Sequence, residues 1–90
     1  MKSYITLIND TLALGLSVSV WDGEAWQVKR SNDKAAIIAA VKSVGEAQLR
    51  IRDSEGNIKG WALVSADIGF EDDETVMDYS DNEFMNQLAA

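Results

Sequence analysis

The chain has 90 residues, 47% of them hydrophobic, with a formal net charge of -7 and neither cysteine nor histidine. This length accommodates one core and no second domain, and the hydrophobic content excludes a disordered chain. The missing cysteines exclude a disulfide scaffold and thiolate metal sites, and the missing histidines remove the commonest general base.

The first predicted element is an amphipathic helix over residues 4–14. Ser3 is a suitable N-cap, and Gly15 is placed to end the helix in a left-handed conformation. Spacings of three and four put one set of apolar side chains on one face, namely Tyr4, Ile5, Ile8 and Leu12. Polar residues interrupt this apolar stretch, so we expect neither a signal peptide nor a membrane span.

A β-hairpin is predicted next, because the apolar spacing changes to two. Residues 16–21 and 26–29 alternate apolar and polar side chains, and Asp22-Gly23 lies between the two runs. Asp-Gly in this position predicts a tight primed turn, which needs positive φ at both central residues. The alternation also points Trp21 away from the apolar face of its strand, so we expect this indole to be partly exposed.

A second helix and a second hairpin repeat this order. One of residues 31–33 caps the helix, Gly45 closes it, and its apolar stripe consists of Ala36, Ile37, Ala40, Val41 and Val44. The hairpin has its turn at residues 53–57 and its returning strand from residue 58 to about residue 68. Residues 61–64 are apolar on both faces, which indicates an inner strand.

The remaining residues predict an acidic loop at 70–74, a short strand or extended arm at 75–79, and a short helix at 82–88. The whole chain is then one α+β domain in the order α-β-β-α-β-β-(β)-α. We expect an antiparallel sheet of four to five strands from two hairpins, with helices on one face. The two halves are alike in outline but show no repeat at the residue level.

Charge is segregated along the chain. Residues 1–66 hold all eight bases against seven acids, whereas residues 67–90 hold eight acids and no base. An anionic region repels nucleic acid and anionic lipid and attracts basic protein surfaces. The predicted partner-binding residues are Asp67, Glu71, Asp72, Asp73, Glu74, Asp78, Asp81 and Glu83, together with Trp21. The alternative interpretation is that the acids only keep the domain soluble.

No catalytic, cofactor or metal site is predicted. The carboxylates do not fit an EF-hand, because a loop starting at Asp78 has Glu83 at its sixth position and Ala89 at its twelfth. The stretch 56–60 lacks the spacing of a phosphate loop and is interpreted as a hairpin turn and the start of a strand.

Four bases, Lys29, Arg30, Arg50 and Arg52, suggest a modest basic patch, since Arg50 and Arg52 share one face of a strand. The favoured interpretation of this patch is a solvated sheet face that faces the acidic segment.

Residues 16–24, 26–31, 51–53 and 60–61 resemble small acidic proteins of bacteriophages and prophages. This resemblance implies a host-takeover or anti-defence factor in the bacterial cytoplasm, of the kind that occupies the nucleic-acid site of a host protein. The leading hypothesis is therefore a nonenzymatic protein, monomeric or homodimeric, that docks on a basic surface of a host protein. The alternatives are a module that self-associates through a sheet edge or the Trp21 face, and a carboxylate-based hydrolase.

Overall fold

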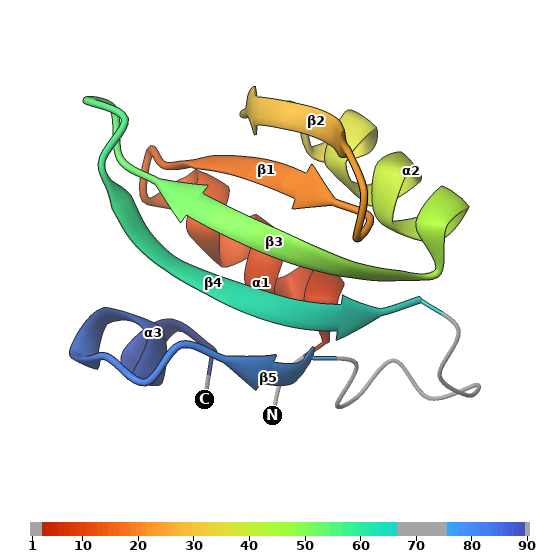
Figure 1. The fold of residues 1–90 in the computed structure, drawn as a ribbon. Helices are drawn as coiled ribbons and strands as arrows, with labels where there is room; N and C mark the ends of the chain where they lie inside the picture. Colours follow the sequence, from red (N-terminus) through yellow and green to blue (C-terminus); the bar gives the residue numbers. More distant parts are fainter. Residues whose placement is uncertain (1–2, 67–75, 90) are drawn as a thin grey trace.

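The computed structural model describes residues 3–66 and 76–89. Within this part of the chain, the elements are α1 (Tyr4–Ala13), β1 (Ser17–Trp21), β2 (Trp26–Ser31), α2 (Lys34–Val44), β3 (Glu46–Arg52), β4 (Ile58–Ser65), β5 (Val76–Tyr79) and α3 (Glu83–Ala89). The five strands form one antiparallel sheet in the order β2-β1-β3-β4-β5 (Figure 1). The predicted α+β fold and its order of elements are thus confirmed.

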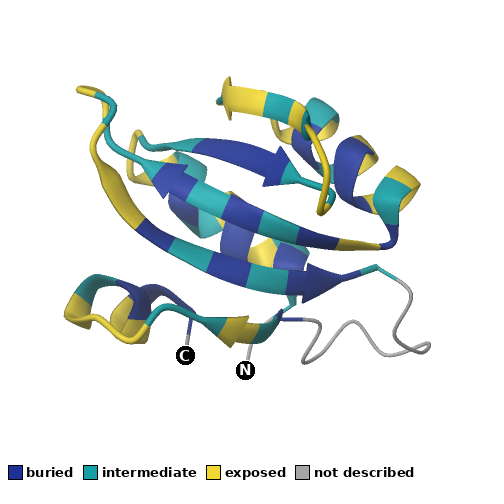
Figure 2. Ribbon diagram, in the orientation of Figure 1, coloured by how far each residue is buried: buried dark blue, intermediate teal, exposed yellow. Residues whose placement is uncertain are grey.

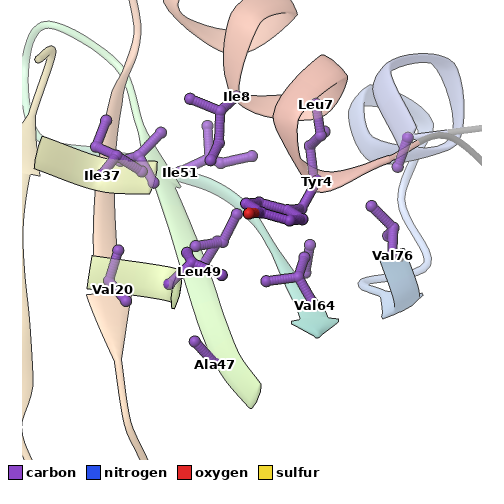
Figure 3. Close-up of a cluster of buried hydrophobic side chains, with 14 of the residues drawn as sticks. Tyr4, Leu7, Ile8, Val20, Ile37, Ala47, Leu49, Ile51, Val64 and Val76 are labelled. Atoms are coloured by element: carbon purple, nitrogen blue, oxygen red, sulfur yellow. The ribbon is translucent and has the colours of Figure 1, made fainter. Parts of the chain in front are cut away.

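The core lies between the sheet and its helices. Leu7 and Ile8 of α1 and Ile37 of α2 are fully buried against β3 residues such as Leu49 and Ile51 (Figure 3). Figure 2 shows the consequence on β3 and β4, where buried residues alternate with less buried ones. Successive side chains of a strand point to opposite faces. One face of the sheet therefore joins the core, while none of the described helices covers the other (Figure 1).

Both long helices begin and end as their sequences predict. The Ser3 hydroxyl accepts a hydrogen bond from the Thr6 amide at 3.1 Å, and the Asp33 carboxylate accepts from the amides of Ala35 and Ala36. These caps satisfy donors that the first turn of a helix leaves unpaired. Gly15 and Gly45 follow the last turns with φ of 79° and 89°.

The first hairpin turn differs from the prediction. Trp21 pairs with Trp26, so the loop holds four residues, and Gly23 has positive φ whereas Asp22 does not. The predicted two-residue primed turn is therefore wrong, although the hairpin is confirmed. The cause is the Asp22 carboxylate, whose Oδ1 accepts from the amides of Glu24 and Ala25 at 2.7 Å each and stabilises the wider loop.

The two hairpins meet at the centre of the sheet. Their first strands, β1 and β3, pair antiparallel around Ser19 and Arg50, and their second strands, β2 and β4, lie outside them. Strand β4 has partners on both sides, which confirms the predicted inner strand. The hairpins are thus related by an approximate two-fold axis through the β1–β3 ladder.

Candidate functional site

The face of the sheet opposite the helices carries large side chains that are only half-buried. Trp21, Arg50, Trp61 and Leu63 lie on this open face, because the residues that alternate with them in their strands join the core. Trp26 lies on the same face because it pairs with Trp21. This confirms the predicted partial exposure of Trp21. Three half-buried indoles thus lie on a face that none of the described helices covers.

The indoles of Trp21 and Trp26 form an edge-to-face pair with ring centroids 4.9 Å apart and an interplanar angle of 62°. The guanidinium of Arg50 stands 5.4 Å from the centre of the Trp26 ring and donates to the Gln48 side chain at 3.2 Å. Trp21 is therefore one member of an aromatic and cationic group, an arrangement that follows from the register of three strands rather than from any local motif.

A cationic pocket, defined by Ser19, Trp26, Lys29, Arg30 and Arg52, lies beside this group with a volume of about 200 Å³. Its position depends on an irregularity in β2, which holds more residues than the stretch of β1 that it pairs with. At this irregularity Arg30 has φ of 47°, a left-handed conformation that costs a non-glycine residue about 1–2 kcal/mol.

Two contacts fix this pocket. The amide of Arg30 donates to the hydroxyl of buried Ser19 at 2.8 Å, which holds the irregular segment against β1. Arg52 donates from Nη1 to the Gly56 carbonyl at 3.0 Å, and a Cβ on Gly56 would lie 3.3 Å from Arg30 Nη1. Both guanidinium groups thus meet at the β3–β4 turn.

The pattern of the sequence predicted part of this basic group. Arg50 and Arg52 share the open face, as expected. Arg30 also lies with Lys29 and Arg52, as the predicted basic patch has it. Its left-handed backbone was not predicted, because this conformation departs from the alternation of a regular strand.

Three of the predicted acidic residues lie on the described segment at the β5 edge of the sheet. Asp78 is in β5, Asp81 follows that strand, and Glu83 begins α3; all three are exposed. The other predicted acids, Asp67 and Glu71 to Glu74, lie outside the described residues.

The segment that carries the three acids is tied to β4. The Ser80 amide donates to the Trp61 carbonyl at 3.0 Å, and the Trp61 amide donates back to the Ser80 hydroxyl at 3.2 Å. The Asn82 side chain donates to the Lys59 carbonyl at 2.9 Å. The Lys59 ammonium stands 5.5 Å from the centre of the Phe84 ring, so one cation lies next to this segment. Asp78, Asp81 and Glu83 are therefore displayed from a hydrogen-bonded framework.

Among the described residues, the two carboxyl groups with clearly shifted pKa values, Asp22 and Asp53, belong to turns. Hydrogen bonds from the Ala25 and Glu24 amides lower the pKa of Asp22, and a hydrogen bond from the Asn57 amide is the largest cause that lowers the pKa of Asp53. Amide donors stabilise the ionised form of each carboxyl. These shifts are explained by turn structure and call for no catalytic role.

Within residues 3–66 and 76–89, no group of three or more acidic side chains is arranged to hold a metal ion. No helix in the same ranges is long and apolar enough to cross a bilayer. Comparisons of the chain with protein-family models, with curated proteins and with solved structures find no match.

Proposed function

We propose that this protein is a nonenzymatic binding factor whose acidic region, residues 67–83, docks on a basic surface of another protein and competes there with nucleic acid. The observation that carries the proposal is the exposure of Asp78, Asp81 and Glu83 on one segment that is hydrogen-bonded to β4. In the sequence, five more acids precede this segment, and the chain has no base after Lys59.

Two physical arguments support docking through this region. A concentrated anionic surface steers basic partners and raises the rate of encounter. Acids fixed on a framework also lose less conformational entropy on binding than acids on a free tail. The acidic region presents negative charge, as the phosphates of a nucleic acid do. A basic surface of the partner would therefore bind either this protein or nucleic acid, but not both at once. The resemblance to small acidic bacteriophage proteins supports a bacterial partner in the host cytoplasm.

The test uses the full chain as bait in bacterial lysate, at about 50 mM and about 300 mM salt, where screening differs strongly. We expect a basic nucleic-acid-binding protein to be captured at low salt and released at high salt. Asp78→Asn, Asp81→Asn and Glu83→Gln together should weaken its binding at least about tenfold and reduce the salt dependence.

The matched control removes three acids from the body of the domain, by Glu24→Gln, Glu46→Gln and Glu55→Gln. This variant has the same net charge as the first triple variant and should bind almost as the wild type does. Equal losses in the two variants would mean that only net charge matters, and the proposed docking region would then be wrong.

A second candidate, self-association, is favoured by the half-buried indoles of the open face. Light scattering across protein concentration distinguishes the two functions, because self-association through this face requires an oligomer that Trp21→Ser weakens.

A further inference from the structure

We propose that the cationic pocket of Ser19, Trp26, Lys29, Arg30 and Arg52 binds a phosphate group. This site lies on the open sheet face, and it is independent of the acidic docking region proposed above. It also runs against the charge of the whole chain, since a protein of net charge -7 gathers three cations around one pocket.

Like charges converge on this pocket. Arg52 Nη1 donates to the Gly56 carbonyl. Arg30 Nη1 contacts the same glycine, since it would lie 3.3 Å from a Cβ built there. Lys29 adds a third cation to the lining of the pocket. Cations that are held near one another repel, and an anion between them converts this repulsion into attraction.

The backbone of Arg30 also points to a function for its side chain. Glycine and asparagine are the residues that adopt the left-handed region most readily, yet an arginine occupies it here. The hydrogen bond from its amide to buried Ser19 needs no particular side chain. Strained residues of this kind concentrate at functional sites, which indicates that the guanidinium itself is the group put to use.

The donors that line the pocket suit a phosphate group. Beside them, Nε of Arg52 is buried and has no hydrogen-bond partner within the described residues, and a buried donor without a partner costs free energy. A phosphate monoester offers three acceptor oxygens and a charge between -1 and -2 near neutral pH, which suits three cationic side chains. A carboxylate offers two oxygens and one charge, for which a single arginine suffices.

The size of the pocket limits what enters it. Its volume of about 200 Å³ is below the usual range for drug-sized ligands, roughly 300–1,000 Å³. The pocket therefore holds the phosphate itself, while the rest of the ligand lies over the open face near Trp26. That phosphate could belong to a mononucleotide or to the end of a single strand, and these two sources share the recognised chemistry.

The test is a titration of the full chain at low salt, followed by amide chemical shifts and calorimetry. The probes are inorganic phosphate, adenosine monophosphate, a hexanucleotide with a 5′-phosphate, the same hexanucleotide with a 5′-hydroxyl, and succinate as the carboxylate probe. We expect saturable shifts at the Ser19 and Arg30 amides with every phosphomonoester probe and much weaker ones with succinate. If adenosine monophosphate binds as tightly as the 5′-phosphorylated hexanucleotide, the rest of the strand adds no affinity. The phosphate that the pocket recognises is then that of a mononucleotide.

The decisive variant is Arg30→Asn, because asparagine tolerates the left-handed conformation and the domain should stay folded. It should weaken phosphate binding at least about tenfold, as expected for the loss of charge-assisted hydrogen bonds. Lys42→Gln is the matched control: it removes one positive charge from an exposed position on α2, and its affinity should stay within about twofold of the wild type. Glu55→Gln removes an acid from the adjoining turn and should strengthen binding.

Three results would overturn the proposal. The first is the absence of shifts at about 10 mM inorganic phosphate, a concentration that saturates even a millimolar site. The second is succinate binding as tight as phosphate binding. The third is an Arg30→Asn variant that binds phosphate as tightly as Lys42→Gln does. An unchanged denaturation midpoint would show that this variant is folded.

Discussion

Gly60 shows how one residue without a side chain joins two elements. A Cβ at this position of β4 would overlap Cγ and Sδ of Met85 and would lie 3.0 Å from the Ser80 hydroxyl. The fully buried Met85 side chain thus occupies the space above the glycine and attaches α3 to the sheet. This contact adds to the hydrogen bonds of Ser80 and Asn82 that hold the acidic β5–α3 segment against β4.

Gly60→Ala should therefore lower the free energy of unfolding by about 1–3 kcal/mol, the usual cost of overpacking a core. Urea denaturation followed by tryptophan fluorescence measures this change. Met85→Ala supplies the control, because it removes the side chain that the new methyl group meets. The double variant should be no less stable than Met85→Ala alone, and additive losses would show that Met85 is not the cause.

At the scale of elements, the Asp22 carboxylate controls the β1–β2 hairpin. Its Oδ1 accepts two loop amides, and its Oδ2 accepts from the Gln27 side chain at 2.6 Å. These donors lower the pKa of Asp22 below its ordinary value of 3.8. Because the folded pKa is below the unfolded one, the resulting stabilisation is present above about pH 3.8 and is lost as the pH falls through the folded pKa.

Asp22→Asn tests this account of the hairpin, because the amide oxygen still accepts the loop amides but carries no charge. The wild type should be more stable than this variant at pH 6, and the difference should shrink steadily between pH 4 and pH 2. Urea midpoints measured across this range give the answer. A difference that stays constant down to pH 2 would show that the charge of Asp22 contributes nothing.

Elements were largely predictable because local patterns determine them. The caps at Ser3 and Asp33, the stripe of α2 and the alternation in β3 each depend on residues close in sequence, and each is seen in the structure. The four-residue loop after Trp21 was not predicted, because hydrogen bonds from loop amides to one carboxylate decide its length.

The same limit applies to the candidate site. The partial exposure of Trp21 followed from alternation alone. Its pairing with Trp26 and the cation above that ring did not, because both depend on strand pairing. The cationic pocket was harder still to predict. Arg30 and Arg52 lie together because β2 has an irregular register and because Arg52 is hydrogen-bonded to Gly56 in the β3–β4 turn.

At the scale of the whole molecule, charged residues are distributed unevenly. The described body, residues 3–66, holds seven bases and seven acids, while described residues 76–89 hold three acids and no base. Like charges gathered at one edge of a small domain repel one another and oppose the compact state.

Raising salt from about 10 mM to about 200 mM should therefore increase the free energy of unfolding by screening this repulsion. Asp78→Asn with Glu83→Gln should reduce that increase, whereas Asp33→Asn with Glu46→Gln in the body should reduce it less. Urea denaturation at the two salt concentrations measures both effects. A wild type that loses stability with salt would show that attractions, rather than repulsions, dominate the exposed charges.

The two-fold relation of the hairpins carries a consequence for how such a chain could arise. Each half is a helix followed by two strands, and each extends its sheet by pairing its first strand with that of the other half. Two identical copies of a half of this kind could pair in the same way, as a symmetric dimer. Joining the copies by a short linker would turn the interface of that dimer into the centre of a single-chain domain, after which the two sequences would be free to diverge.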